Sequence, residues 1–375
     1  MKRALFICTY GGFITSFETN NIKILQKQGY EVHIAANFKE KSKNKKPELL
    51  EHLNVVQHNI EFKRNPLTFN NIKGAFILNR LIKKYQFDEI DCHNPVCGVL
   101  GRICGRFNHV SHIIYTAHGF HFYKGAPLKN WLLYYPVEWL CSWWTDVLIT
   151  INNEDYSCAK KHFHMKKLEK IPGVGLDIDR FANCHIDRKE KCKELGIPAD
   201  KFIMLSVGEL NVNKNHGIVI DALNRLENGN IVYLIAGQGT LMNAYKDKIM
   251  YLNLEKQVKL LGYRSDVDEL YQMADCYIHP SLREGLGMAP LEAMASGLPV
   301  ICSQIRGNVD LIENGKGGYL FQRDSVEDIK EAINKTLNDK GFRVRAEKIN
   351  KENVKSYGID ECNMIMEQIY RCLDK

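Results

Sequence analysis

The sequence predicts an α/β protein with two domains, each built on a doubly wound parallel sheet. Short apolar runs alternate with helical patterns along the whole chain, which is typical of parallel sheets covered by helices. This alternation starts twice, and a charged, weakly periodic stretch at residues 171–200 separates the two series. The chain has 375 residues, of which 45% are hydrophobic, so it exceeds what one core usually serves.

Each series supplies enough strands for one sheet. The first half contains six candidate strands: Ala4–Cys8, Glu31–Ala35, Val55–His58, Glu89–His93, His112–Thr116 and Asp146–Thr150. The second half contains five: Phe202–Val207, Ile231–Ala236, Val258–Leu261, Cys276–His279 and Leu298–Cys302. We therefore expect a first domain at residues 1–180, a second at 181–357 and a final helical segment at 358–375.

The most informative segment is residues 278–302, which reads IHPSLREGLGMAPLEAMASGLPVIC. A strand breaks at Pro280, and a helix follows with a proline near its start and Gly297 after its end. Glu284 falls in the loop and Glu292 in the expected first turn of this helix, so both should face one mouth. A helix N-terminus suits a diphosphate, and carboxylates accept hydrogen bonds from sugar hydroxyls. Glu292 could also simply complement the dipole of its own helix.

This segment resembles the donor-site signature of family 4 glycosyltransferases, in which two glutamates separated by seven residues flank a bound nucleotide sugar. The resemblance implies the GT-B fold, in which two Rossmann-like domains face each other across a cleft and the terminal helix crosses back to the first domain. It also implies transfer with retention of anomeric configuration and without a metal. By the same resemblance, the donor contacts include the residues between the two glutamates, namely Gly285, Leu286, Gly287 and Met288.

The loop after Phe202–Val207 carries the candidate phosphate-binding cation. Lys214 follows Gly208, itself a candidate donor contact, in this loop. The family aims this lysine at the donor phosphates, where it offsets charge on the leaving diphosphate. Many members have an arginine directly after this glycine, but this chain has Glu209. The usual pair of cations is therefore incomplete, and the residues that could compensate are Arg283, Arg264 and His216.

Three further segments are candidate donor contacts. Gly11 and Gly12 follow the first strand, and Thr15 to Glu18 then reads as a capping box that opens the first helix. Strand, glycine turn and helix N-terminus form a phosphate-accepting geometry, although the spacing is not that of a dinucleotide-binding motif and a structural turn is equally consistent. By resemblance, Gly237, Tyr263 and Arg264 end two other strands beside the nucleotide, although glycines at strand ends are also ordinary turn residues.

His118 is the candidate catalytic residue of the first half. It follows the strand His112–Thr116 and lies in the stretch TAHGFHF at residues 116–122, at the strand edge where open α/β sheets bind ligands. The resembled family places such a histidine beside the sugar and the reacting carbon. Residues 123–156 resemble the branch of the family that assembles capsular, exopolysaccharide or O-antigen chains on lipid carriers.

Composition argues against a metal site and a disulfide framework. The twelve cysteines are scattered, several lie in apolar strands, and no two have CxxC spacing, so we expect reduced core residues. We expect no metal and no other cofactor besides the nucleotide-sugar substrate.

The first domain carries an excess of basic residues, which bears on whether it binds a membrane. Residues 1–180 contain 25 Lys and Arg against 16 Asp and Glu, while the remainder contains 26 against 28. Such lysines often lie on solvated faces, but a basic half beside the aromatic stretch 124–144 also fits an anionic leaflet. Two lysine clusters contribute to this excess: one contains Lys39, Lys41, Lys43, Lys45 and Lys46, and the other contains Lys160, Lys161, Lys166 and Lys167.

No apolar stretch reaches the roughly 20 residues of a membrane span, so we expect a cytoplasmic protein, peripheral on the inner face of the cell membrane. Nucleic-acid binding is not expected, because no such motif is present.

The function predicted from these observations is transfer of a sugar, from a UDP-hexose or UDP-N-acetylhexosamine, to a polyprenyl-diphosphate-linked saccharide. An isomerase, epimerase or phosphorylase on the same fold is an alternative, as is a non-catalytic subunit that binds a nucleotide. An epimerase would need acid and base groups at the sugar ring, and a phosphorylase a pyridoxal-binding lysine. Neither pattern is present in the sequence. The donor sugar, linkage and oligomeric state are not encoded in any motif.

Overall fold

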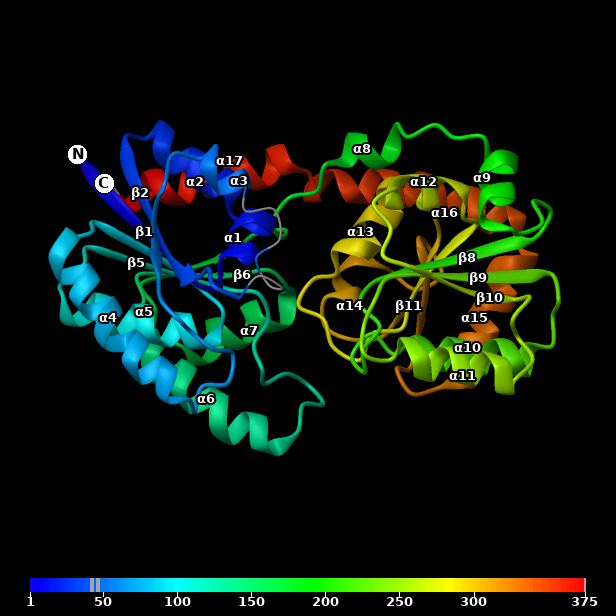
Figure 1. Cartoon of the computed structure of the whole chain (residues 1–375), viewed down its shortest axis with the longest axis horizontal. Helices are drawn as coiled ribbons and strands as arrows, with labels where there is room; N and C mark the ends of the chain where they lie inside the picture. The colour runs from blue at the N-terminus through cyan, green and yellow to red at the C-terminus, as the bar shows by residue number, and fades with distance from the viewer. Residues whose placement is uncertain (41–43, 45–47, 374–375) are drawn as a thin grey trace. The chain divides into compact units, whose positions relative to one another are not determined.

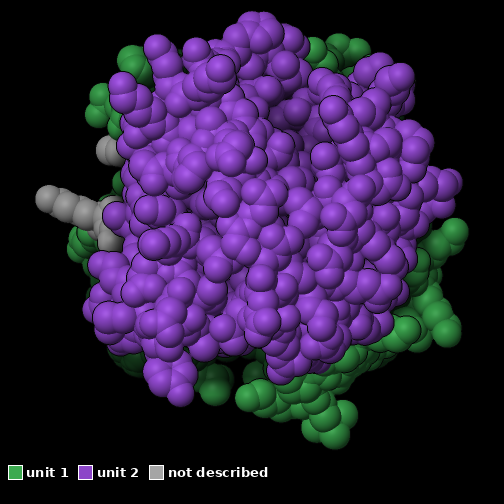
Figure 2. Space-filling view, turned by 90° about the vertical axis from the view of Figure 1, so that its right-hand side faces the viewer, with its two compact units in different colours: residues 1–175, 360–375 green, residues 176–359 purple. Residues whose placement is uncertain are grey.

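The structure is a computed structural model that describes residues 1–40, 44 and 48–373. It divides into two compact units, which Figure 1 and Figure 2 show: unit 1 comprises residues 1–175 and 360–375, and unit 2 comprises residues 176–359. The sequence predicts domain boundaries at 180/181 and 357/358, and the two units of the structure are divided at 175/176 and 359/360. Lys41, Lys43, Lys45 and Lys46 of the first lysine cluster lie outside the described residues.

Unit 1 contains a seven-stranded parallel sheet with the order β3-β2-β1-β4-β5-β6-β7. The register joins Ala4 to Glu89 between β1 and β4, where the strand order reverses. The strands are β1 (Lys2–Tyr10), β2 (Tyr30–Asn37), β3 (Val56–Asn59), β4 (Glu89–His93), β5 (His112–Ala117), β6 (Val147–Thr150) and β7 (Lys167–Lys170).

Helices cover both faces of this sheet, with α4 to α7 on one face and α1, α2 and α17 on the other (Figure 1). The core includes Ile7, Ile90 and Ile113 from three neighbouring strands. The helices are α1 (Gly11–Phe17), α2 (Thr19–Lys27), α3 (Glu48–Glu51), α4 (Phe69–Tyr85), α5 (Pro95–Phe107), α6 (Leu128–Ser142), α7 (Asn153–His162) and α17 (Ile359–Leu373).

Unit 2 contains a six-stranded parallel sheet with the order β10-β9-β8-β11-β12-β13, which reverses between β8 and β11. Its core includes Leu205, Tyr277 and Val300. The strands are β8 (Phe202–Val207), β9 (Ile231–Ala236), β10 (Val258–Gly262), β11 (Cys276–His279), β12 (Val300–Ser303) and β13 (Gly318–Phe321).

The helices of unit 2 follow the same alternation. They are α8 (Ile178–Ala182), α9 (Arg188–Leu195), α10 (His216–Leu226), α11 (Met242–Tyr251), α12 (Val267–Met273), α13 (Met288–Ala295), α14 (Asn308–Leu311), α15 (Val326–Asn338), α16 (Lys340–Asn353) and the 3₁₀ helix η2 (Val354–Tyr357). Two parallel sheets with this topology confirm the predicted fold class.

The strands, the first helix and the cysteines can be compared with the predictions from the sequence. All eleven expected strands are present, but β7 and β13 at the sheet edges were not predicted. The capping box at Thr15 to Glu18 is wrong, because β1 runs directly into α1 and Glu18 separates α1 from α2. All twelve cysteines lie in the described part of the chain and are free, and most are buried, as expected.

Candidate active site

The first cluster of functional groups lies at the carboxyl end of the unit 2 sheet, where the strand order reverses. Lys214 lies in the loop after β8 and Glu284 in the loop after β11, and these two strands are neighbours. Ligands of open α/β sheets bind at this point, because the loops of adjacent strands diverge there and leave a crevice. The topology therefore brings together two residues that the sequence separates by 70 positions.

Lys214 and Glu284 form a close ion pair, with Nζ 2.6 Å from Oε1. His279, at the end of β11, also places its Nε2 3.1 Å from the same carboxylate oxygen. Burial alone would raise the pKa of Glu284, but the hydrogen bond from His279 and the charge of Lys214 hold that pKa well below its usual range. Glu284 is therefore a carboxylate fixed in position and able to accept further hydrogen bonds.

His279 is a site residue that the sequence pattern does not predict, because it reads only as the end of a strand. Its ring is buried, and burial lowers its pKa, so it is neutral and can donate one hydrogen bond. Ser281 Oγ lies 3.1 Å from the same ring nitrogen, and Tyr277 OH lies 3.3 Å from the other. A polar residue at the carboxyl end of an apolar strand is the signal that could have identified it.

The two loops are also joined through their backbones. Leu282 N–H donates to Asn213 O at 2.7 Å, and Asn213 Nδ2 donates to Arg283 O at 3.0 Å. The buried Arg306 donates from Nε to Glu284 O at 3.2 Å. These contacts fix the loop that carries Glu284, and they place a guanidinium beside it that the sequence analysis did not name.

Glu292 has a separate set of partners. It is the fifth residue of α13 and thus lies in its second turn, not in the first turn as the sequence analysis expected. Tyr271 OH donates to its carboxylate at 2.8 Å. Burial raises the pKa of Glu292, while the Tyr271 hydrogen bond and the charge of Arg180 oppose that shift. Tyr271 is a second residue that the sequence analysis missed.

Glycines in these loops allow close approach of the backbone. A Cβ on Gly237 would lie 1.8 Å from the carbonyl oxygen of Gly208, so these two strand ends can pack together only with glycine at position 237. Gly307 has a φ of +82°, and a Cβ there would lie 2.5 Å from Gly285 O. At Gly287 a Cβ would come within 2.9 Å of Pro290. Packing explains these glycines whether or not a ligand contacts them.

The remaining candidates between and beside the carboxylates differ in exposure. Leu286 and Met288 are half-buried and pack against the unit 2 core, so only part of each side chain is open to a ligand. Tyr263 is exposed. Arg264 donates from Nε to Asp266 at 2.7 Å and pairs with Glu194 at 2.8 Å, so acidic neighbours already hold its guanidinium.

The structure also distinguishes the residues that could replace the missing arginine at Glu209. Burial, with the charges of His279 and Lys214, lowers the pKa of His216 to about 3, so His216 is uncharged at neutral pH. Arg264 is held by its acidic partners. Arg283 is exposed, and Arg306 lies beside the Glu284 backbone. These two arginines remain as cations near the Lys214 loop.

A second cluster lies in unit 1, again at the carboxyl edge of the sheet where the order reverses between β1 and β4. Glu18, His93 and His118 come from the chain after β1, the end of β4 and the loop after β5. His93 Nδ1 lies 3.3 Å from His118 Nε2, and Glu18 Oε1 lies 3.5 Å from the same His93 nitrogen. Burial lowers the pKa of His118 to about 4 and that of His93 well below its usual range.

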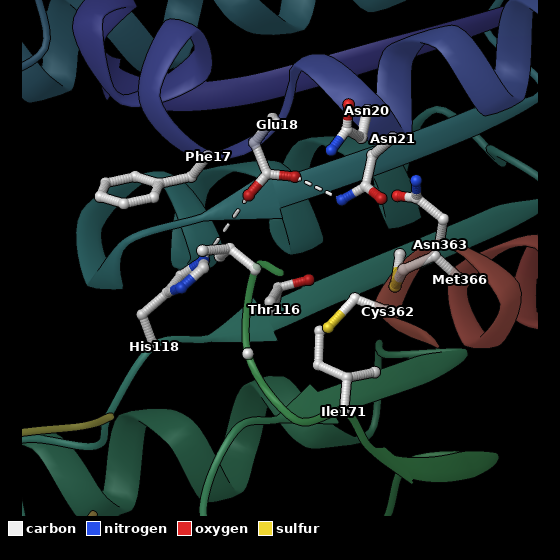
Figure 3. A pocket seen from close by; sticks show the side chains of 12 residues that line it. Phe17, Glu18, Asn20, Asn21, Thr116, His118, Ile171, Cys362, Asn363 and Met366 are labelled. Atoms are coloured by element: carbon white, nitrogen blue, oxygen red, sulfur yellow. Dashed lines mark hydrogen bonds and ion pairs between the residues drawn. The ribbon is translucent and has the colours of Figure 1, made fainter. Parts of the chain in front are cut away.

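A pocket of unit 1 opens beside this cluster. Figure 3 shows Glu18 between the ring of His118 and the amide of Asn21, which donates to Glu18 at 2.7 Å. Asn20 and Asn363 line the same pocket, so most of its polar groups are amides and a carboxyl. The sequence predicts His118 as a site residue, whereas its local pattern places Glu18 in a helix cap and His93 in a strand.

Gly11 and Gly12 lie in the first turn of α1. Gly12 N–H donates to Asn44 Oδ1 at 3.0 Å, so this donor is already engaged. A Cβ on Gly11 would lie 2.4 Å from the ring of Phe38, which explains the glycine by packing. The structure thus supplies a structural reason for Gly11, and the contact of both glycines with a donor stays a prediction.

Among the described residues of unit 1, Glu18, His93 and His118 could hold a metal, because their ligand atoms all lie within 4.8 Å of one another. Two imidazoles and a carboxylate are a ligand set that zinc accepts. The expectation that the enzyme needs no metal stays a prediction.

Comparison with known proteins identifies the family. A family model described as glycosyl transferase 4-like matches residues 7–152, and one described as glycosyl transferases group 1 matches residues 187–353. EpsD of Bacillus subtilis, which is named as a glycosyltransferase, is 37% identical over 86% of this chain and 84% of its own. The chain belongs to the family 4 (group 1) glycosyltransferases.

Two further proteins refine the comparison. The UDP-Gal:alpha-D-GlcNAc-diphosphoundecaprenol alpha-1,3-galactosyltransferase of Escherichia coli is 31% identical over 79% of this chain and 78% of its own. Anabaena HepE, solved in complex with UDP and glucose, has a TM-score of 0.79 and 18% identity and covers 100% of both chains. At this identity HepE shows the fold alone, which is GT-B. The protein is a glycosyltransferase of this fold.

Proposed function

We propose that this enzyme transfers a hexose or N-acetylhexosamine, with retention of configuration, from a UDP-sugar to a polyprenyl-diphosphate-linked saccharide. The observation that carries the proposal is the Lys214–Glu284–His279 cluster at the point of strand reversal in unit 2. The names of the E. coli galactosyltransferase and of the UDP-bound HepE structure support this donor and this kind of acceptor. Capsule, exopolysaccharide or O-antigen assembly is the corresponding process.

The roles of the donor-site residues follow from their chemistry. An ammonium group has three N–H donors, so Lys214 can keep its bond to Glu284 and still donate to a diphosphate oxygen. During transfer the bond between the anomeric carbon and the diphosphate oxygen breaks, and negative charge builds on the leaving UDP. Lys214 offsets this charge, with Arg283 or Arg306 as the second cation. Glu284 accepts hydrogen bonds from the donor sugar, and Glu292 from the ribose.

In unit 1, His118 contacts the sugar near the reacting carbon. Its ring is neutral at physiological pH, because burial lowers its pKa to about 4. A neutral imidazole can accept a hydrogen bond from a hydroxyl, whereas a charged one cannot.

A donor panel tests the proposal. UDP-sugars, GDP-sugars and free nucleotides are compared for thermal stabilisation and then for transfer to polyprenyl-diphosphate-linked saccharides. A donor at 100 times its Kd stabilises the fold by about 2.7 kcal/mol. NMR of the product then reports its anomeric configuration. An inverted product, or stabilisation by no UDP-sugar, contradicts the proposal, and interconversion of the UDP-sugar without an acceptor would favour the epimerase alternative.

We also propose that unit 1 docks on an anionic membrane through α4, α5 and α6. No helix of the described residues is long and apolar enough to span a bilayer. However, large apolar side chains are exposed on these helices and next to their ends: Leu67, Phe69, Ile72, Phe76, Phe107, Leu128, Leu132, Trp139 and Trp143. Exposed large apolar side chains in such number on neighbouring helices are a feature of interaction surfaces.

The charge around this surface favours an anionic membrane as its partner. Of the four acidic side chains in residues 63–145, all of which the structure describes, none is exposed. The same range carries exposed basic residues at Arg64, Lys73, Arg80, Lys83, Lys84, Arg106, Lys124 and Lys129. Each contributes about 1 kcal/mol near an anionic leaflet, and each inserted large apolar side chain adds about 1.5–3 kcal/mol.

Vesicle sedimentation tests this docking surface. Wild type should bind acidic vesicles more than neutral ones, and salt should weaken binding because the Debye length falls to about 3 Å at 1 M. Phe76→Glu and Leu132→Glu should each reduce binding. Val344→Glu, on an exposed apolar residue of unit 2, is the matched control and should not. Equal binding to both vesicle types, or equal loss in the control, contradicts the proposal.

A further inference from the structure

Three side chains of unit 1 converge on one point at the carboxyl end of its sheet. Glu18 lies between α1 and α2, His93 is the last residue of β4, and His118 follows β5. His93 Nδ1 lies 3.3 Å from His118 Nε2 and 3.5 Å from Glu18 Oε1. The third separation, between His118 Nε2 and Glu18 Oε1, is 3.9 Å. One atom of each residue thus forms a small triangle, of which the proposed transfer uses only His118.

This triangle has nearly the size of one face of a zinc coordination sphere. Zinc binds imidazole nitrogen and carboxylate oxygen at about 2.0–2.2 Å, so neighbouring ligand atoms of a tetrahedral site lie roughly 3.3–3.5 Å apart. Two of the three separations already match, and the one at 3.9 Å would have to shorten by about 0.5 Å. Only the contact between His93 and His118 is a hydrogen bond. Hydrogen bonding therefore does not explain why Glu18 Oε1 approaches both rings.

The charged neighbours of Glu18 also favour a cation. Its side chain is 2% exposed, and its ion-pair partners within residues 1–40, 44 and 48–373 are the two histidines rather than a lysine or an arginine. Buried carboxylates are normally paired with a cation or coordinate a metal. Oε2 of Glu18 accepts a hydrogen bond from Asn21 at 2.7 Å, which leaves Oε1 on the side of His118 (Figure 3).

The packing around the two histidines holds their rings in place. Phe13 contacts both imidazoles, with ring centroids 5.4 Å from His93 and 4.9 Å from His118. Behind His93, Asp91 accepts a hydrogen bond from Tyr370 OH at 2.7 Å, and Asp91 Oδ1 lies 3.3 Å from His93 Nε2 without a hydrogen bond between them. A metal on Nδ1 would leave the ring proton on Nε2, facing a carboxylate, as is common behind metal-binding histidines.

The open side of such a site would face the pocket. His93 is fully buried, whereas the side chain of His118 is 21% exposed beside a pocket that Asn20 and Asn21 also line. A zinc ion with three protein ligands keeps a fourth position for water or another small ligand. Because His118 Nε2 would bind the metal, zinc would occupy a lone pair of the proposed catalytic residue and add positive charge beside it.

We propose that Glu18 Oε1, His93 Nδ1 and His118 Nε2 form a zinc site in unit 1, and that zinc bound there inhibits sugar transfer. Imidazole ligands suit zinc, whereas Mg²⁺ and Ca²⁺ prefer oxygen ligands. Zinc binding goes beyond the proposed function and does not depend on it, but the inhibition rests on the role of His118 in that function. An inhibitory site agrees with the expectation that transfer itself needs no metal.

Calorimetric titration of the metal-free full chain with Zn²⁺ tests the site, with Mg²⁺ as the comparison. Wild type should bind Zn²⁺ and should not bind Mg²⁺ at this site. Because all twelve cysteines are free and Cys372 is exposed, zinc X-ray absorption must identify the ligands. Nitrogen and oxygen ligands lie at about 2.0–2.2 Å and sulfur at about 2.3 Å. Wild type that binds no zinc, or binds it only through sulfur, overturns the proposal without any variant.

The ligands are then removed one at a time. Glu18→Gln, His93→Gln and His118→Gln should each weaken zinc binding by about 100-fold or more, since loss of even an outer partner of a metal ligand costs about 10–100-fold. Glutamine keeps the approximate shape of Glu18 and an acceptor for Asn21. Thermal unfolding without zinc identifies any variant that does not fold, and the remaining variants then decide. Wild-type zinc affinity in the folded variants overturns the proposal.

His58→Gln is the matched control. His58 lies 2.9 Å from His33 in the same unit, and the described residues add no third ligand atom that converges with this pair. His58→Gln should therefore bind zinc with wild-type affinity. A loss of zinc binding in His58→Gln equal to that in His93→Gln would place the metal elsewhere and overturn the proposal.

Transfer rates at buffered concentrations of free zinc test the inhibition. Turnover of wild type and of His58→Gln should fall as zinc binds and should recover in EDTA, while Glu18→Gln should keep its own zinc-free rate. Zinc also binds the diphosphate of a nucleotide sugar, which would slow every variant equally. Equal inhibition of wild type and Glu18→Gln therefore overturns the inhibitory role. Zinc bound by the three ligands without inhibition overturns it too and contradicts the role of His118 in the proposed function, while the donor site of unit 2 is untouched.

Discussion

Removing the Lys214 ammonium should lower stability modestly and turnover severely. Glu284 is 14% exposed and Lys214 23% exposed, so their pair at 2.6 Å lies between the surface and the interior. Breaking a fully buried pair costs about 3–5 kcal/mol, and an exposed pair is worth about 0–1 kcal/mol. His279 still donates to Glu284 in Lys214→Ala. We therefore expect a loss of about 1–3 kcal/mol in the free energy of unfolding.

The pH dependence of this loss follows from the depressed pKa of Glu284. Its stabilising contribution is present above the unfolded pKa, near 4.3, and disappears as pH falls toward the folded value. The stability difference between wild type and Lys214→Ala should therefore be constant near neutrality and should shrink below about pH 4.3. Urea denaturation across this pH range measures it.

Turnover separates a structural lysine from a catalytic one. If Lys214 also stabilises the leaving diphosphate, kcat should fall by about 10²–10³-fold, the scale for one lost electrostatic group. Lys248→Ala is the matched control, because Lys248 forms a 2.7 Å pair with Asp221 in the same unit, and these side chains are more exposed, at 31% and 42%. Lys248→Ala should change neither the free energy of unfolding nor kcat much. Wild-type kcat in Lys214→Ala, with the stability loss present, would refute the catalytic role.

Three further predictions address the metal, unit 1 and the ribose contact. Activity should persist in EDTA, because Lys214 supplies positive charge at the diphosphate; loss on chelation that Mn²⁺ restores would contradict this. His118→Ala should reduce kcat by about 10²-fold while UDP affinity measured by calorimetry stays near wild type, and a parallel loss of UDP binding would assign His118 to the nucleotide. Tyr271→Phe should weaken UDP binding several-fold, because its hydroxyl holds Glu292 at 2.8 Å; unchanged affinity would mean that Glu292 needs no such support.

Most of the fold could be predicted from the sequence, because strands that are buried in a sheet appear in the sequence as apolar runs. Nine of the eleven expected strands are wholly or mostly buried, and the edge strands β3 and β10 are the two that are not. In contrast, β7 (KLEK) is half-exposed and polar at a sheet edge, and β13 is four residues long and starts with glycine. Neither edge strand has a local pattern strong enough to identify it. Pairing with a neighbour, which is a tertiary interaction, determines both.

The site was predictable where function leaves a local motif. Glu284, Glu292 and Lys214 lie in contiguous segments that carry the family resemblance, and His118 follows a clear strand. Partners from distant segments leave no such signal: Tyr370 lies 279 positions from Asp91, and Tyr271 lies 21 positions from Glu292.

Glu18 shows why a local pattern can mislead. Its spacing from Thr15 fits a helix cap, but tertiary packing buries Glu18 beside His93 and His118 instead.

The central claim is that the two carboxylates of unit 2 hold different parts of one UDP-sugar, and calorimetric titration of free UDP tests it most directly. UDP contains the ribose but no donor sugar. Glu292→Ala should therefore weaken UDP binding by about tenfold, the loss of one hydrogen bond to a charged group of about 1.5 kcal/mol. Glu284→Ala should bind UDP like wild type and transfer sugar slowly. Loss of UDP binding in Glu284→Ala with wild-type affinity in Glu292→Ala would contradict the claim.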